Sequence, residues 1–434
     1  MLAVLAGAVA PALADAQDRL SLADAIARAR SHNLDARSAE SAERQAAQRV
    51  AQARAGYLPT VDASETWQRG NQPVFVFSSL LAQRRFAASN FAIDALNHPD
   101  AIGNTRTALT IDQAVFDPAT RAGVRAATVG LEIAATGRSS LGQDLAVAVS
   151  GAFGAVLTAE AARTAAAAAV ETAMADLELA RNRRDVGMVT DADVLQLDVS
   201  LARARASQIR AGADATVARA RLNEVIGEPL DAVFDLEDPP DPAPVADSAL
   251  AALEASALAE RPDITLAALH EQLAASGVEA AHAAYLPRVS VQAGWEANGG
   301  SWDSRASSWV IGAVGRVNLF RGFADRARVA EAREQQSQRA LERQKAERTA
   351  RLDVRVAVAR LTAARAAEAV GRAAGTQARE SHRIIRDRYE GGLAAVSALL
   401  RAAEEVQQAD ARQAGARVDV MLAAAELNRA VGKR

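Results

Sequence analysis

Four short segments of the chain alternate between apolar and polar positions, which is the pattern of a β-strand with one apolar face. These segments lie near residues 57–67, 107–116, 286–296 and 308–320. Each is about ten residues long, which is the length that a tilted strand needs to cross a bilayer. The alternation alone fits an ordinary half-buried sheet and a transmembrane barrel equally well.

Long helices are predicted between these strands. No proline interrupts residues 119–186 or 322–390, so each stretch is expected to form one continuous helix, roughly 100 Å long at a rise of about 1.5 Å per residue. Gly187 and the pair Gly391-Gly392 then break the helical pattern, which resumes a few residues later. Each long helix is therefore expected to fold back on a second helix as a hairpin. A globular enzyme has no use for rods of this length.

The second half of the chain repeats the first. Tyr57-Leu58-Pro59 recurs as Tyr285-Leu286-Pro287 at an offset of 228 positions, and Leu222-Asn223 recurs as Leu427-Asn428 at an offset of 205. An offset of this size indicates a duplicated half-protein, because solenoid repeats have periods of about 20 to 50 residues. The difference between the two offsets leaves 23 extra residues between the first two strands.

The chain divides into four expected parts. These are a signal peptide over residues 1–16, a first structural repeat over 17–227, a proline-rich linker over 228–247 and a second structural repeat over 248–434. The signal peptide is expected because residues 2–13 are apolar and uncharged and Ala12-Leu13-Ala14 suits a cleavage site, although the usual preceding basic residues are missing. The linker is expected because it holds five of the twelve prolines.

A membrane interpretation of the strands requires an oligomer. No stretch after the signal peptide is expected to be apolar enough for a membrane helix, so only strands could cross the bilayer. Four strands cannot close a barrel, and an open edge in lipid would leave backbone groups unpaired. Three chains would supply twelve strands, an even number within the range of known barrels. Trp67, Trp295 and Trp309 lie at strand ends, where the aromatic girdle of such a barrel would be.

Composition removes most enzymatic and nucleic-acid functions. The chain has no cysteine, so disulfides, thiolate metal sites and a cysteine nucleophile are excluded. Its five histidines include no pair at metal-ligand spacing, and its net charge of −3 gives no general attraction to nucleic acid. We therefore predict no enzyme activity, catalytic residue, metal site or cofactor, and no nucleic-acid partner.

Positive charge is concentrated in one of the long helices. Residues 321–388 hold 17 lysines and arginines against nine acidic residues. One interpretation is a solvated helix face with Glu–Arg pairs at helical spacing. The other is a lumen that attracts anions, which depends on the face that the arginines occupy.

Together these features resemble the TolC-like outer-membrane efflux proteins, also called outer-membrane factors. The resemblance covers about residues 18–432 and rests on the duplicated Tyr-Leu-Pro, the Leu-Asn-x-x-x-Gly helix endings and the hairpin turns at Gly187 and Gly392. It implies a mixed α and β membrane protein that is a homotrimer, with a 12-stranded barrel in the bacterial outer membrane and a periplasmic α-barrel of long antiparallel helical hairpins. No cysteine follows the expected signal, so we do not expect a lipid anchor.

The resemblance also implies a function and partners. The trimer would conduct substrate passively, as the channel-tunnel of a tripartite efflux or type I secretion system. Its partners would be a periplasmic adaptor (membrane fusion) protein, an inner-membrane pump of RND or ABC type and outer-membrane lipid. An alternative from another class is a soluble periplasmic coiled-coil scaffold or adaptor protein. The cargo is not specified by the sequence: drugs, metal ions and polypeptides all fit.

Three groups of site residues follow from the resemblance. The periplasmic tips that would contact the adaptor are Val186, Gly187, Met188, Gly391, Gly392 and Leu393. The pore constriction would lie near Asp191, Asp193, Ala398 and Arg401. The lipid-facing barrel residues would be Val61, Trp67, Leu109, Ile111, Val291, Trp295, Trp309 and Ile311. Some relatives carry two aspartates where this chain has Ala398 and Arg401, which puts their cation filter in doubt here.

Residues 68–106 and 297–307 would be external loops of the barrel. The first of these is long and the second is its short counterpart, which accounts for the 23-residue excess of the first half.

Overall fold

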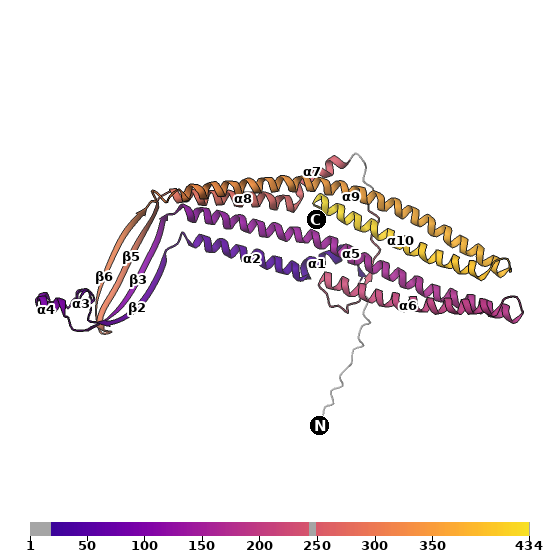
Figure 1. The fold of residues 1–434 in the computed structure, drawn as a ribbon, viewed down its shortest axis with the longest axis horizontal. Helices are drawn as coiled ribbons and strands as arrows, with labels where there is room; N and C mark the ends of the chain where they lie inside the picture. Colours follow the sequence, from indigo (N-terminus) through magenta and orange to yellow (C-terminus); the bar gives the residue numbers. More distant parts are fainter. Residues whose placement is uncertain (1–18, 243–248, 434) are drawn as a thin grey trace, which may run out of the picture. The chain divides into compact units, whose positions relative to one another are not determined.

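The computed structural model describes residues 19–242 and 249–433, which form long helices and a four-stranded sheet (Figure 1). The expected signal peptide at 1–16, residues 243–247 of the expected linker and residue 248 of the expected second repeat lie outside the described residues. The chain forms two compact units. The first contains the described residues up to 41, 136–266 and those from 344 onward, and the second contains 42–135 and 267–343.

The second unit contains the four-stranded sheet. Its strands are β2 (Thr60–Gly70), β3 (Ile102–Phe116), β5 (Arg288–Ser301) and β6 (Ser304–Arg316). They pair antiparallel in the order β2-β3-β5-β6, so β2 and β6 are the two edges. A β-bulge interrupts the β3–β5 register near its end, between Ala114 and Phe116.

The strands differ from the expected segments at their ends. β3 begins at Ile102 rather than near 107, and β6 begins at Ser304 rather than near 308. These extensions were not predicted because they contain charged residues. In the structure the charges are paired, Arg106 with Glu296 of the neighbouring strand and Arg305 with Glu65. The external loop expected over 297–307 is therefore only a tight turn at Trp302 and Asp303.

The expectation that residues 68–106 form one long loop was wrong at both ends and in the middle. β2 continues to Gly70, and β3 starts at Ile102. Between them lie α3 (Pro73–Ala82), the 3-10 helix η1 (Ala88–Phe91) and α4 (Ile93–Asn97). α3 is a continuous apolar run with proline at its start, which a helix accepts at its first position.

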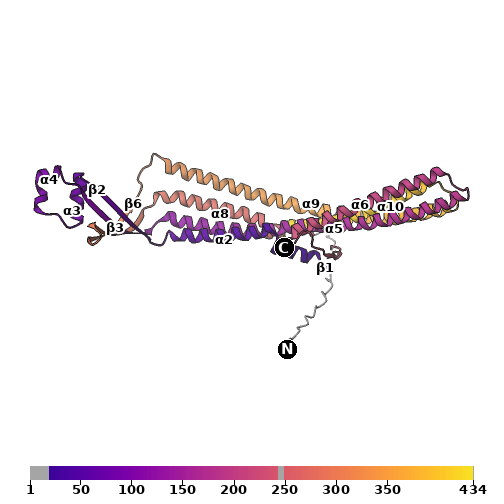
Figure 2. The ribbon, with the colours of Figure 1, turned by 90° about the horizontal axis from the view of Figure 1, so that it is seen from below.

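Long helices make up most of the chain. They are α1 (Leu22–His32), α2 (Leu34–Ala55), α5 (Pro118–Asp185), α6 (Asp191–Ile226), α7 (Leu250–Glu260), α8 (Pro262–His282), α9 (Ala324–Glu390) and α10 (Val396–Val431). α8 is followed by the short 3-10 helix η3 (Ala283–Tyr285). Figures 1 and 2 show α6 beside the C-terminal part of α5, and α10 beside that of α9. Each of these pairs is a hairpin.

Three buried clusters hold the first unit together. The first includes Leu20, Phe153 and Ile226, which are fully buried. Here β1 (Arg19–Leu20) also pairs in parallel with β4 (Asp235–Leu236), a strand inside the expected linker. The second cluster joins α7, α9 and α10. The third joins the ends of the two hairpins.

One helix is more apolar than the sequence analysis expected. α5 contains an 18-residue window of mean hydropathy 1.7, enough to span a membrane by length and composition. The expectation that no later stretch is this apolar was therefore wrong. The buried side chains of α5 include Val149, Phe153 and Val156, and all three pack in the first cluster. Packing against other helices thus accounts for part of this apolar surface.

The two halves of the chain make equivalent helix contacts. Asn33, between α1 and α2, donates its side-chain amide to the carbonyl of Val225 at 2.9 Å. Arg261, between α7 and α8, donates its guanidinium to the carbonyl of Ala430 at 3.3 Å. These positions correspond under the two sequence offsets. In each half, the end of the hairpin's second helix is therefore held against the break between two shorter helices.

Candidate functional site

The sheet has one apolar face. In antiparallel strands, directly opposite residues share a face. The register places Val61, Ile111, Ala293 and Ile311 in one row across all four strands, and Ala63, Leu109, Trp295 and Trp309 in the next. All eight residues predicted to face lipid lie on this side of the sheet, by the same alternation. The two tryptophans and two isoleucine side chains line a shallow groove of about 250 Å³ with their neighbours.

The opposite face is polar, and its groups are paired across strands. Gln292 donates to the carboxylate of Asp112 at 2.7 Å. Arg106 forms an ion pair with Glu296 at 2.7 Å. These cross-strand bonds give the charged groups hydrogen-bond partners even where bulk water is limited. A sheet with these two faces can separate an apolar surrounding from a wet interior.

A charged cluster that the sequence analysis missed lies at the far end of the apolar face. Arg305 forms an ion pair with Glu65 at 3.0 Å, and both interact with the hydroxyl of Thr107. The guanidinium of Arg305 also lies 3.7 Å from the ring centroid of Trp302. Paired charges and tryptophan are typical of the boundary between lipid and water. Arg305 and Trp302 had been expected in an external loop, which is why the cluster was not found.

The predicted tip residues lie in the two hairpin turns. Gly187 and Gly392 have φ of +78° and +74°, a left-handed conformation that glycine adopts without steric cost. Both turns close in the same way, since the amides of Met188 and Leu393 donate to carbonyls five residues earlier, each at 2.8 Å. Val186, Met188 and Leu393 are largely exposed apolar side chains. Gly391 lies beside Gly392 in the second turn.

The predicted constriction residues have different surroundings. Asp193 caps α6, because its carboxylate accepts from the backbone amide of Thr190 at 3.0 Å and from its hydroxyl at 2.8 Å. Asp191 is solvent-exposed, with its carboxylate 4.0 Å from Arg184. Ala398 is half-buried and Arg401 exposed, one turn apart on α10. The two aspartates and this second pair therefore belong to different hairpins.

A buried polar cluster near the tips was also missed. Asp176 of α5 lies 3.9 Å from the guanidinium of Arg386 on α9. Arg183 of α5 donates to the backbone carbonyl of Tyr389. The Cζ atom of Arg183 also lies 5.3 Å from the centroid of the Tyr389 ring. Among the residues that the structure describes, Asp176, Arg386, Tyr389 and His382 each have a buried side-chain atom with no hydrogen-bond partner. The cluster joins the two hairpins.

Burial dominates the electrostatics of this cluster. It raises the pKa of the Asp176 carboxyl above its ordinary value, and the charges of Arg386 and His382 oppose this only in part. Burial likewise raises the pKa of the Tyr389 hydroxyl, against the effect of Arg183. The sequence held one signal: Asp176 and Arg183 are seven positions apart, hence on one helix face. Pairing of α5 with α9 was not deducible.

Across residues 19–242 and 249–433 we find no group of three or more histidine or acidic side chains placed to hold a metal ion. The features that the geometry offers are a two-faced sheet and two exposed helical turns.

Comparison with known proteins gives one family. The family described as "Outer membrane efflux protein" matches residues 25–228 and 253–433, one range in each half of the chain. The chain is 31% identical over 405 residues to Protein CyaE of Bordetella pertussis, which covers 90% of this chain and 80% of CyaE.

Solved structures share the fold. The outer membrane protein VceC of Vibrio cholerae has a TM-score of 0.76 at 19% identity, covering 95% of this chain and 96% of VceC. The CmeC outer membrane channel of Campylobacter jejuni has a TM-score of 0.77 at 17% identity, covering 95% and 85%. At these levels of sequence identity, the structural similarity shows the fold alone.

Proposed function

The chain belongs to the outer membrane efflux protein family, and on that premise we propose that three copies form one channel-tunnel that conducts substrate passively across the periplasm and outer membrane. Family membership makes it an efflux or secretion channel protein of the outer membrane rather than a member of an enzyme family.

The sheet is the observation that carries this proposal. In a single chain its apolar face exposes Trp67, Trp309 and Ile311, which would be costly in water over so large a patch. Its edges β2 and β6 have no strand partner within the described chain. Unpaired backbone groups in lipid cost several kcal/mol each. Pairing β6 of one copy with β2 of the next satisfies both edges, and three copies close a barrel of twelve strands.

The two faces then take opposite roles. The apolar row of Val61 and Ile111 faces lipid, and the polar row of Asp112 and Gln292 faces the lumen. The charged cluster around Arg305 lies at one edge of the lipid-facing band, where headgroups and water replace hydrocarbon.

The long helices form the periplasmic part of the tunnel. Hairpins α5–α6 and α9–α10 from three copies are assembled side by side as an α-barrel. The turns at Gly187 and Gly392 contact a periplasmic adaptor through Val186, Met188 and Leu393. The adaptor joins the tunnel to an inner-membrane pump that supplies the energy. The glycines themselves serve the turn geometry, and the neighbouring apolar side chains form the contact.

The constriction lies near the tips, and its residues have unequal roles. Asp191 is solvent-exposed, with its carboxylate 4.0 Å from Arg184, and can line a pore, whereas the carboxylate of Asp193 is already engaged in the helix cap. The cluster of Asp176, Arg183 and Arg386 holds the two hairpins together. It must rearrange when the hairpins separate to open the tunnel.

A soluble coiled-coil scaffold or adaptor is disfavoured by the exposed tryptophans of the apolar face. Reconstitution into planar bilayers tests the choice directly. The channel account expects discrete conductance steps from protein that needs detergent to stay in solution. Protein that is soluble without detergent and gives no conductance would contradict it. Transport assays with an RND or an ABC pump then distinguish efflux from type I secretion.

A further inference from the structure

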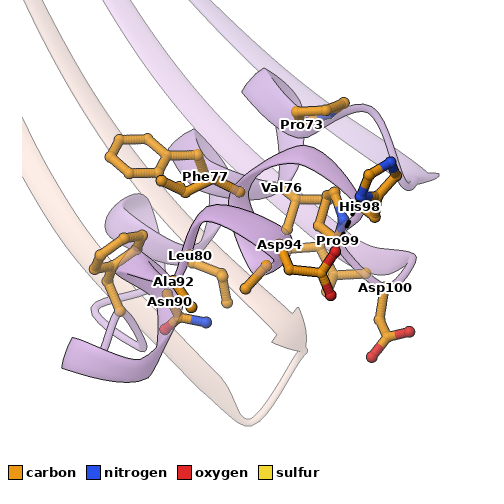
Figure 3. Close-up of a pocket in the computed structure, with 14 residues that line it drawn as sticks. Pro73, Val76, Phe77, Leu80, Asn90, Ala92, Asp94, His98, Pro99 and Asp100 are labelled. Carbon is orange, nitrogen blue, oxygen red and sulfur yellow. Dashed lines mark hydrogen bonds and ion pairs between the residues drawn. The ribbon is translucent and has the colours of Figure 1, made fainter.

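The segment between β2 and β3 folds into a small helical body, which we call the cap and define as residues 73–97. Its aromatic side chains pack edge to face: the ring centroids of Phe77 and Phe86 are 4.7 Å apart, and those of Phe86 and Phe91 are 5.1 Å apart. Figure 3 shows a cavity between α3 and α4. Its volume is about 540 Å³, and Phe77 and Phe86 are among the residues that line it. The cap is thus a folded element in which aromatic rings pack together beside a cavity with both polar and apolar lining residues.

The cap is fixed to the polar face of the sheet. Gln83, just after α3, donates to the side chain of Asn104 at 2.9 Å, and Asn104 donates to Asn298 at 2.9 Å. All three amides are buried, at 6%, 7% and 2% exposure. Asn104 and Asn298 share the alternation of Arg106 and Glu296, so they lie on the polar face.

A second contact fixes the cap to another strand. Arg84 donates to the backbone carbonyl of Ser307 in β6 at 2.9 Å. Arg85 donates to the side chain of Gln83 at 3.1 Å and so orients the first amide. Together these contacts join the cap to β3, β5 and β6 at the end of the sheet where β2 and β5 finish. Figures 1 and 2 both show α3 and α4 at this end.

The cap exposes apolar side chains that nothing in the single chain covers. Val74 is 74% exposed, Phe91 65% and Ile93 78%, and half of Leu81 is also exposed. Several exposed apolar side chains on so small an element favour a contact with another molecule. Because the cap is anchored on the face that we assign to the lumen, the patch would point into the barrel and not into lipid.

The size of the barrel suggests the occupant. Twelve strands spaced about 4.8 Å apart and tilted by about 40° enclose a backbone cylinder about 24 Å across. Three helices, each about 10–12 Å across with side chains, fill a circle about 22–26 Å wide. Three copies of α3, the longest helix of the cap, therefore match the width of such a barrel.

We propose that the three caps meet at the barrel axis through Val74, Leu81, Phe91 and Ile93 and close the external mouth of the channel. This inference rests on the proposed trimeric barrel. The buried amides hold each cap in place, and the apolar contact between caps is the part that separates when cargo leaves.

Cross-linking tests the contact between caps, and the absence of native cysteines makes single-cysteine variants unambiguous. Phe91→Cys and Ile93→Cys are oxidised in outer membranes. The proposal expects a disulfide-linked dimer from at least one of them. Asp303→Cys, in the exposed β5–β6 turn at the same end of the sheet, is the control and should stay monomeric. Its copies would lie about 20 Å apart on a barrel of this size, beyond disulfide reach. Monomer alone from both cap variants would overturn the contact.

Labelling of the lumen tests the closure itself. Thr110→Cys, on the polar face, is treated with a bulky maleimide added outside intact cells. We expect slow labelling in the full chain. Labelling should be many-fold faster when residues 73–97 are replaced by a short Gly-Ser linker, or when Gln83→Ala loosens the anchor. Equally fast labelling in all three would overturn the cap proposal and leave the channel intact. No labelling in any of them would contradict the lumenal assignment, and with it the barrel on which the cap depends.

Discussion

Single residues decide where helices can end and pack. Gly227 ends α6 with φ of +78°, and a Cβ there would lie 2.5 Å from the backbone carbon of His32. Gly432 ends α10 with φ of +85°, and its Cβ would lie 2.8 Å from the carbonyl carbon of Glu260. The Leu-Asn-x-x-x-Gly endings noticed in the sequence therefore have a physical reason, because no other residue fits so close to a second backbone.

Gly227→Ala should lower the free energy of unfolding by about 2–4 kcal/mol, from left-handed strain plus a backbone clash. Gly187→Ala is the matched control, since it has the same φ and nothing within 4 Å of a new Cβ. Its free energy of unfolding should fall only by the cost of the left-handed strain, about 1–2 kcal/mol. Thermal unfolding in detergent measures both. Equal losses in the two variants would show that the close approach to His32 has no energetic role.

The two faces of the sheet can be tested at neighbouring residues. Ile111→Arg places a charge on the apolar face, and we expect it to destabilise the inserted barrel by about 2–4 kcal/mol. Thr110→Arg places the same charge on the polar face and should be tolerated. Heat-resistant assembly on gels and the amount of folded protein in outer membranes are the readouts. The reverse order of effects would exchange the lipid and lumen assignments.

Asp176 should make stability depend on pH in a definite direction. Its folded-state pKa is raised above the value of 3.8 by burial. The folded protein therefore binds more protons than the unfolded chain between 3.8 and the raised pKa, and this group's contribution to stability falls as pH rises through that interval.

Asp176→Asn removes this dependence. The variant should gain stability relative to the native chain as pH rises from 3.8 through the raised pKa, and Arg386 keeps Glu390 as a partner at 3.4 Å. Unfolding free energies compared at several pH values provide the measurement. A stability difference that stays constant across pH would mean that the carboxyl titrates normally in the folded state.

Among the secondary-structure elements, the alternation of apolar and polar residues located the strands. The strand ends were not predicted, because they contain charged residues that pair with residues on other strands. The apolar run of α3 gave no alternation, so a helix was hidden inside a predicted loop. The arginines of α9 were open to two interpretations. Arg339, Arg372 and Arg383 each pair with a glutamate three or four positions away, which supports the solvated, paired face. The buried cluster at Asp176 could not be predicted because it needs α5 and α9 side by side.

The first turn of α6 depends on its cap. Thr190 and Asp193 bond reciprocally as a capping box. Asp193→Ala should cost about 1 kcal/mol locally and speed hydrogen exchange in that turn. Asp191→Ala is the control, because its exposed carboxylate makes no such bond, and it should leave exchange unchanged. If instead only Asp191→Ala speeds exchange, the capping assignment is wrong.

The whole molecule, as we propose it, functions only as an assembly of several chains. One chain supplies four strands with an apolar face and two unpaired edges, and one pair of long hairpins. Neither the barrel nor the tunnel can form from a single copy. The family follows from the sequence match, and the three copies that we propose would close the sheet as a barrel of twelve strands.

Native mass spectrometry of the protein extracted from outer membranes in detergent tests this claim most directly. We expect a complex of three chains, each of at most 45.4 kDa. We further expect that charged substitutions along the β6 edge reduce the complex to single chains. A native mass of one or two chains, from protein that still conducts in bilayers, would contradict the three-chain barrel.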